Sequence, residues 1–199
     1  MKKRILSLAL SAAMALTMLP TGAFAASDKG KPPVYNKATG CYEISTPDQL
    51  LYLSGSWRDG APRDGHYVLT ADIDMTGVKG FKPIASKKDQ GFTGTFDGQF
   101  HAIKGLRVEY EKKYAGLFGY VGNQDDQAYI KDVALLDCYV TGQQNVGALA
   151  GVNYGTITGC VVTGEVKCLD LSNSHTAGGI CGKLKEGEGP IVGHVEDCY

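Results

Sequence analysis

Short apolar segments fill most of the chain and are separated by glycine, asparagine, aspartate or Thr-Gly turns. The pattern Ile/Val-x-x-apolar recurs four times, beginning at Ile103, Ile130, Ile157 and Val195. The first two intervals are equal, and the third is longer by an amount that matches a polar insertion at "CLDLSNSHT" or "KLKEGEGP". Within each unit, apolar and polar residues alternate with the two-residue period of a strand, which predicts three short strands per unit.

A repeat of this length predicts one coil of a triangular parallel β-helix. Two further shared elements support the unit: "AGLFG", "VGALAG" and "AGGICG" on the one hand, and "YVTG" and "VVTG" on the other. Three short strands and three turns fill about 27 residues, and each coil pairs its backbone with the next coil about 4.8 Å away. The sequence therefore predicts an all-β solenoid of about four coils. A β-propeller blade and an antiparallel sandwich remain alternatives.

The repeat predicts which side chains face the interior. One inward column is expected to consist of Leu106, Val133, Cys160 and Cys198. A second inward column is expected to consist of Ile103, Ile130, Ile157 and Val195, and the outward column beside them of Arg107, Ala134, Val161 and Tyr199. Cysteine replaces leucine and valine in the first column, as a small buried hydrophobic residue does.

The segment "STPDQLLYLSG" before the repeats has a different pattern. Thr46 is the expected N-cap, Pro47 the first helical residue and Gln49 the partner in a capping box. Leucines at positions 50, 51 and 53 form the apolar side, and Gly55 ends the segment. We expect a short helix that covers the first coil, because an uncovered sheet edge promotes aggregation.

The N-terminal segment 1–25 has the pattern of a secretory signal peptide. Basic residues at positions 2–4 precede an apolar run at 5–19, and the segment ends in the small-x-small pattern Ala-Phe-Ala. An uncleaved membrane anchor is the alternative, but proline and glycine interrupt the run before the ~20 apolar residues that a span needs. Cleavage after Ala25 and a secreted or cell-surface location are expected, with no membrane insertion afterwards.

Four segments follow from these patterns. The signal peptide at 1–25 precedes a polar leader at 26–40, an N-terminal cap with the short helix at 41–66, and β-helix repeats at 67–199. The last segment, "VEDCY", is one strand into a new coil. We therefore expect that the repeats are truncated here or continue into further repeats or another C-terminal domain, or that something else covers their open end.

Composition excludes several functions. Without the signal peptide the chain has 17 basic and 21 acidic residues, a net charge of −4, which gives no electrostatic basis for binding nucleic acid or an anionic membrane. Six cysteines allow 15 disulfide pairings in an exported protein, or are buried core residues. Their spacing contains neither a CxxC motif nor a zinc-type Cys/His pair.

The repeats resemble a known family. The stretch "NVGALAGVNYGTITGC" looks like the GLUG motif, and "YVLTADIDMTG…FTGTFDGQFHAIKGLRV…AGLFGYV" looks like the segment that precedes such motifs in bacterial surface proteins. These include adhesin-like proteins and the non-catalytic region of immunoglobulin A1-specific metallopeptidases. The resemblance spans roughly residues 42–199. It implies a right-handed parallel β-helix at the cell surface and no activity of its own, because the peptidase function of that family lies in a separate zinc domain with an HExxH helix.

Parallel β-helices also host polysaccharide lyases and hydrolases, so acidic residues are the catalytic candidates. Asp72 and Asp74 share one strand face, and Asp97 and His101 lie together in "FDGQFH". Such carboxylates bind calcium or act as acid and base, or else they occupy tight turns and coil corners. We favour the structural interpretation and assign no catalytic, cofactor-binding or metal-binding residue. His66, His175 and His194 lie among turn residues and are expected to face solvent.

Tyrosines are the candidates for binding. Of eleven, several lie in or beside predicted turns: Tyr114, Tyr120, Tyr129 and Tyr154. Tyr120 and Tyr154 are the expected surface contacts for a glycan or for a host or bacterial surface protein, with ordinary turn packing as the alternative. The sequence thus favours a non-enzymatic, cofactor-free secreted or surface module of adhesin or stalk type. A β-helical polysaccharide lyase or hydrolase that uses the Asp/His cluster is the second interpretation.

Overall fold

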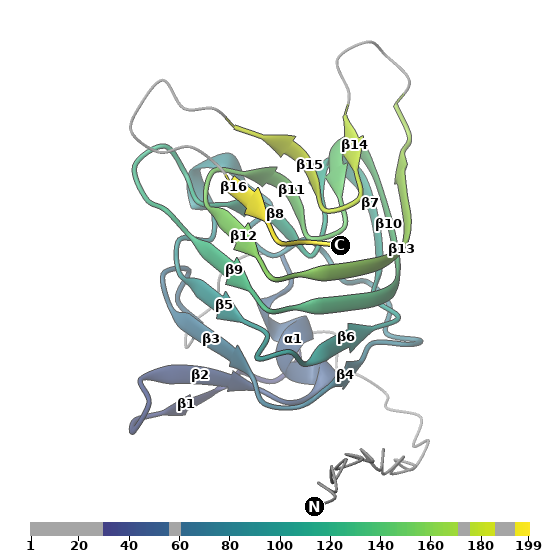
Figure 1. The fold of residues 1–199 in the computed structure, drawn as a ribbon. Coiled ribbons are helices and arrows are strands. Elements are labelled where there is room, and N and C mark those ends of the chain that lie inside the picture. Colours follow the sequence, from purple (N-terminus) through teal and green to yellow (C-terminus); the bar gives the residue numbers. More distant parts are fainter. Residues whose placement is uncertain (1–29, 56–60, 171–175, 186–193) are drawn as a thin grey trace, which may run out of the picture.

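The computed structural model describes residues 30–55, 61–170, 176–185 and 194–199. The chain forms a parallel β-solenoid of about four turns, which confirms the predicted fold class (Figure 1). The predicted signal peptide and His175 lie outside the described residues, as does part of the polar insertion. Among the described strands every pairing is parallel except one at the N-terminal end.

Three sheets form the three sides of the solenoid, and strands of successive turns lie side by side in each sheet (Figure 1). The first sheet contains β1 (Val34–Asn36), β2 (Cys41–Ile44), β3 (His66–Leu69), β5 (Thr95–Asp97), β9 (Tyr129–Lys131), β12 (Thr156–Thr158) and β16 (His194–Glu196). The second contains β4 (Ile73–Asp74), β6 (Ala102–Lys104), β7 (Arg107–Ala115), β10 (Ala134–Gly147), β13 (Val161–Cys168) and β14 (Ala177–Gly178). The third contains β8 (Phe118–Val121), β11 (Ala150–Asn153) and β15 (Cys181–Leu184).

A left-handed backbone conformation turns the chain from the first sheet to the second. Asp132, Gly159 and Asp197 occupy this corner in successive turns, with φ of 53°, 61° and 48°. Glycine reaches this region without strain, and aspartate tolerates it better than most residues do. The repeated Ile/Val-x-x-apolar pattern is therefore a strand end, a left-handed corner and the next inward residue.

One predicted alignment is wrong. Ile130, Ile157 and Val195 do pair in register, but the residue that pairs with Ile130 in the preceding turn is Phe96. Ile103 instead pairs with Leu135, on the second sheet. The error has a physical cause, since Gly105 is also left-handed, with φ of 68°, but it bends the chain between β6 and β7, within the second sheet.

The corrected register changes the inward and outward columns. The true column on the first sheet is Tyr42, Tyr67, Phe96, Ile130, Ile157 and Val195, and the spacing between its members is not constant. Leu106 lies one residue before the Arg107–Tyr139 pair and so stacks on Cys138, not on Val133. Arg107 likewise leaves the predicted outward column, whereas Ala134 and Val161 pair as expected.

The N-terminal end of the solenoid is covered. Thr46 is the N-cap of helix α1 (Pro47–Leu53). Its side chain accepts a hydrogen bond from the backbone of Gln49 in the predicted capping box. The three leucines of the helix are buried, at 7% exposure or less. Beside it, β1 pairs antiparallel with β2, so the segment predicted as a polar leader contributes an edge strand.

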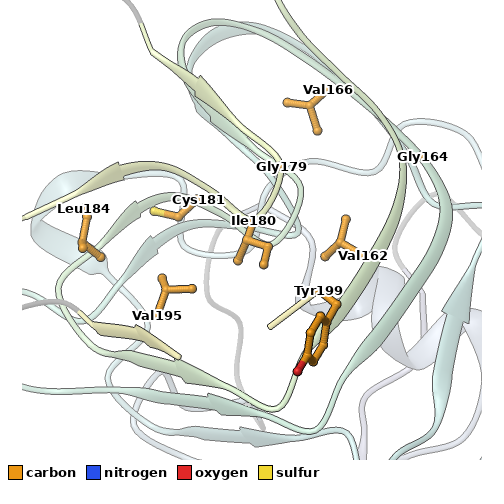
Figure 2. A pocket seen from close by; sticks show the side chains of 9 residues that line it. All are labelled: Val162, Gly164, Val166, Gly179, Ile180, Cys181, Leu184, Val195 and Tyr199. Atoms are coloured by element: carbon orange, nitrogen blue, oxygen red, sulfur yellow. The ribbon is translucent and has the colours of Figure 1, made fainter. Parts of the chain in front are cut away.

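The opposite end, which we call the open end, is not covered by any element that the structure describes. In the described part of the chain, β13, β15 and β16 are the outermost strands of their three sheets. Apolar side chains from these strands and the loops beside them gather at this end, among them Val162, Ile180 and Val195 (Figure 2). The two ends of the solenoid are therefore chemically different.

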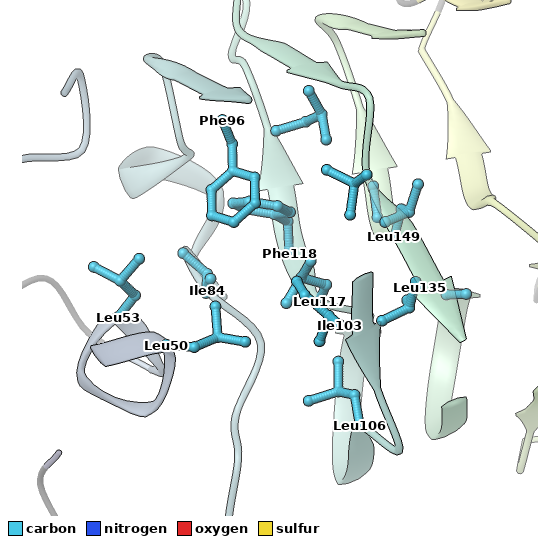
Figure 3. Close-up of a cluster of buried hydrophobic side chains, with 14 of the residues drawn as sticks. Leu50, Leu53, Ile84, Phe96, Ile103, Leu106, Leu117, Phe118, Leu135 and Leu149 are labelled. Carbon is cyan, nitrogen blue, oxygen red and sulfur yellow. The ribbon is translucent and has the colours of Figure 1, made fainter. Parts of the chain in front are cut away.

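One continuous apolar core runs through the turns. Figure 3 shows Leu50 and Leu53 of α1 extending toward Ile84, beside Phe96 and Phe118 of the next turn. Close packing between turns also explains glycine positions outside the corners. A Cβ on Gly155 would clash with the carbonyl oxygen of Ala128 in the turn below.

Replacing Val133 with aspartate tests whether this position faces the core. Val133 is 1% exposed, so the carboxylate would be buried without a partner. It should lower the free energy of unfolding by about 3 kcal/mol. Val161, in the outward position of the next turn, is 39% exposed, and Val161→Asp is the matched control with a change of about 0.5 kcal/mol. Urea denaturation measures both, and equal effects would contradict the register.

Candidate functional site

Asp72 and His101 form a pair across successive turns. The Asp72 Oδ1 atom lies 3.0 Å from His101 Nδ1 and also accepts a hydrogen bond from the backbone of Ala102 at 3.0 Å. The backbone bond is the larger cause of the lowered pKa of the Asp72 carboxyl, and His101 adds to it. The carboxylate is 76% exposed and the pair lies at a coil corner, where it ties one turn to the next.

The other two candidate carboxylates have separate partners. Asp97 accepts a hydrogen bond from the backbone of Gln99 and forms an ion pair with Lys131 at 2.8 Å, which raises the pKa of the lysine. Asp74 accepts a hydrogen bond from the backbone N–H of Thr76 at 2.9 Å. The pKa of Asp74 is lowered first by a hydrogen bond with the Thr76 side chain and then by this backbone bond. A carboxyl with a lowered pKa stabilises the fold above its ordinary pKa and loses that contribution as the pH falls through the lowered value.

These contacts give each candidate a local structural role. Asp72 and His101 are brought together, whereas Asp97 and Asp74 each bond elsewhere. Among the residues that the structure describes, no three His, Cys, Asp or Glu side chains gather where they could hold a metal ion. His66 is exposed, as expected.

The two tyrosines predicted as surface contacts are buried. Tyr120 is 3% exposed and Tyr154 5%, in a small cluster with Val152. The ring of Tyr114 packs against that of Tyr120 with centroids 4.6 Å apart. Burial raises the pKa of Tyr120, and a hydrogen bond with Tyr114 raises it further. The expectation that these rings present an open contact surface is corrected, because Tyr120 of β8 and Tyr154, just after β11, pack with Val152 and Tyr114 in a cluster separate from the main core.

Another tyrosine lies on the outer face of the second sheet. The Arg107 guanidinium lies 4.3 Å from the centroid of the Tyr139 ring, and the Lys167 ammonium lies 5.3 Å from it. Glu109 and Glu165 pair with these two cations at 3.0 and 2.8 Å. Strands β7, β10 and β13 place these groups in successive turns. The predicted alignment missed this arrangement because it placed Arg107 beside Ala134 instead of Tyr139.

The open end of the solenoid holds an apolar cavity of about 550 Å³. Its walls come from β13, β15 and β16 and from the loop beside β14, and Figure 2 shows the side chains of Val162, Ile180 and Val195 around it. Leu184 and Tyr199 at its rim are 47% and 85% exposed. Large apolar side chains and outermost strands thus coincide at one surface, and such surfaces mark sites of interaction.

Comparison with protein-family models gives no match. Two curated proteins are similar in sequence: Halomucin of Haloquadratum walsbyi, 32% identical over 151 residues, and a Gly-rich membrane protein of Evansella cellulosilytica, 33% identical over 101 residues. The alignments cover 71% and 46% of this chain but only 2% and 11% of those proteins. The chain is thus similar to small parts of much longer proteins.

A solved structure shares the fold. An immunoglobulin A1 protease-like protein from Bacteroides ovatus superposes with a TM-score of 0.61 and 21% identity, over 80% of this chain and 46% of that one. At this identity the likeness concerns the fold. In the described part of the chain, no helix has the length and apolar character needed to cross a membrane.

Replacing Tyr120 with alanine tests whether this ring is a packing residue. Removing a buried aromatic side chain should lower the free energy of unfolding by roughly 3 kcal/mol. Tyr129 is 47% exposed, and Tyr129→Ala is the matched control, with an expected change below about 1 kcal/mol. Chemical denaturation followed by circular dichroism measures both, and a Tyr120→Ala protein as stable as the parent would show that the ring does not pack as described.

Proposed function

We propose that this chain is a non-enzymatic β-solenoid module of a secreted or cell-surface protein, of stalk or adhesin type. The observation that carries the proposal is the contrast between the two ends of the solenoid. A capped helix covers the first turn, and an apolar cavity lies beside the outermost strands at the other end. A module with these ends acts by holding and displaying neighbouring parts of a longer protein.

The occupant proposed for the open end is a further turn of β-solenoid. The strands exposed there are of the same kind that already accept a parallel neighbour in every lower turn. Valine and isoleucine at the cavity have the same character as the inward residues of those turns, such as Val133 and Ile157. A further turn supplies hydrogen-bond partners for the outermost strands and apolar side chains that pack against those already at this surface.

The comparisons support a surface location. Halomucin and the Gly-rich membrane protein contain segments similar to this chain within much longer sequences. The resemblance of "NVGALAGVNYGTITGC" to the GLUG motif and the signal-peptide pattern of segment 1–25 favour the same interpretation. The fold shared with the immunoglobulin A1 protease-like protein fits a non-catalytic β-helical region of such a protein.

The adhesin interpretation adds a partner, a glycan or a surface protein of a host or bacterium. The outer face of β7, β10 and β13 supports it better than the buried tyrosines do. Tyr139 there lies beside two cations that are themselves paired with glutamates. An aromatic ring with charged hydrogen-bonding neighbours has the chemistry of sugar or protein contacts.

Appending one turn tests the stacking role. Tyr199 pairs with the backbone on both sides of Val161, so a second copy of residues 135–161 placed after Tyr199 continues the solenoid in register. This turn should stack on the open end and raise the melting temperature by roughly 5 °C. The control carries the same appended segment in scrambled order and should gain nothing. Equal melting temperatures for the two proteins would contradict the stacking role.

Cleavage assays distinguish the enzymatic alternative. Pectate, alginate and glycosaminoglycans are incubated with the protein, with and without calcium, and we expect no cleavage because Asp72, Asp74 and Asp97 bond within the fold. Cleavage that disappears in an Asp72→Asn variant of unchanged stability would instead establish a β-helical polysaccharide lyase or hydrolase. Lys79→Gln, a charge change on an exposed residue, is the control.

A further inference from the structure

Two cysteines occupy the same position in successive turns at the open end. The backbone N–H of Tyr199 donates to the carbonyl of Cys160 at 2.9 Å, and the N–H of Val162 donates to the carbonyl of Tyr199 at 2.6 Å. These two bonds set Tyr199 opposite Val161, and they therefore set Cys198 directly opposite Cys160. The pairing of Thr158 with Glu196 gives the same register.

The side chains follow the backbone. The Cys198 sulfur accepts a hydrogen bond from the backbone N–H of Cys160 at 3.4 Å. Cys160 is fully buried, and Cys198 packs against the same core. Adjacent strands lie about 4.8 Å apart, within the range of roughly 4.4 to 6.8 Å that a disulfide requires between Cα atoms. The positions of these two thiols thus allow a bond without rearrangement of the sheet.

The other cysteines lack such a partner. Each pairs across its sheet with a residue that carries no sulfur: Cys41 with Asn36, Cys138 with Gly164, Cys168 with Gly142 and Cys181 with Ala150. All six thiols are free in this structure. The register therefore favours one bond, Cys160–Cys198, over a complete framework of three disulfides.

We propose that Cys160 and Cys198 are a site of disulfide formation that fastens the final strand to the turn below it. The oxidant is a small disulfide such as oxidised glutathione. Cys198, the more accessible sulfur, attacks it as a thiolate and forms a mixed disulfide, releasing one glutathione thiolate. The Cys160 sulfur then attacks the Cys198 sulfur and displaces the second glutathione, while its proton passes to solvent.

Burial determines the order of these two steps. Removal from water raises the pKa of the Cys160 thiol to about 12, and the neighbouring Cys198 adds to the rise. Cys160 is therefore a poor first nucleophile, and it reacts when brief separation of the last strand admits water. Once formed, the bond closes a segment that begins at Cys160 and ends at Cys198, and it holds β16 at the open end on β12.

The test compares the protein in reduced and in oxidised glutathione. Oxidation should lower the free thiols from six to four and raise the melting temperature by roughly 5 °C, because the cross-link restricts the unfolded chain. Digestion with trypsin and chymotrypsin separates Cys138 from Cys160 at Tyr139 and Tyr154, so mass spectrometry identifies the linked peptides.

Matched variants separate the bond from a general effect of oxidation. Cys198→Ser and Cys160→Val should lose the stabilisation, and valine suits position 160 because Val133 occupies it in the turn below. Cys41→Ser, at the other end of the solenoid, should keep both the cross-link and the temperature rise. Six free thiols after oxidation, or a Cys198 linked to a different cysteine, would overturn the proposal.

Discussion

The pairing of each turn with the turn beneath it is the constraint on which this molecule depends. A single turn supplies three short strands whose backbone groups and inward side chains are satisfied only by neighbours above and below. Within the chain, β9 lies between β5 and β12, and β10 between β6 and β13. The constraint also defines what happens at the ends, because the first and last turns each have one face without a neighbour of their own kind.

The chain treats its two ends differently. Helix α1 covers the first turn with three buried leucines, and its capping box lets this short helix begin at a defined place. The last turn instead exposes Leu184, Val195 and Tyr199 beside an apolar cavity. One end of the solenoid is thus covered and the other is apolar. This difference between the ends is the physical basis of its proposed role as a displayed or displaying module.

The fold could be predicted from the sequence because local rules repeat in it. Strand length, alternation and glycine or aspartate at left-handed corners all recur, and the capping box identified the first residue of α1. The same repetition prevented a full prediction of the register, because similar local sequences occur at positions that do not pair. The segments 103–106 and 130–133 have similar sequences, and each has a left-handed third residue. They lie at different places in the turn, as the pairing of Ile103 with Leu135 shows.

The candidate residues illustrate the same limit. Turn composition favoured a tight turn at Asp97 and a coil corner at Asp74, and each carboxylate accepts a hydrogen bond from a backbone N–H two residues further on. Turn composition could not reveal that Tyr120 and Tyr154 belong to a packed cluster. The Tyr139 cluster and the Cys160–Cys198 juxtaposition both required the true register, since their members lie in different turns. Which residues meet between turns depends on how many residues each turn contains. This number varies along the chain, so a fixed repeat length does not give the contacts.

Amide hydrogen exchange on the folded chain tests the central claim most directly, since it reports how well each strand is held by its neighbours. The stacking account predicts strong protection in β9, β10, β11 and β12, which have parallel neighbours on both sides, and faster exchange in β13, β15 and β16 at the open end. Protection in β16 as strong as in β9 would contradict the account, because a strand with a neighbour on one side would then be held as firmly as a strand with neighbours on both sides.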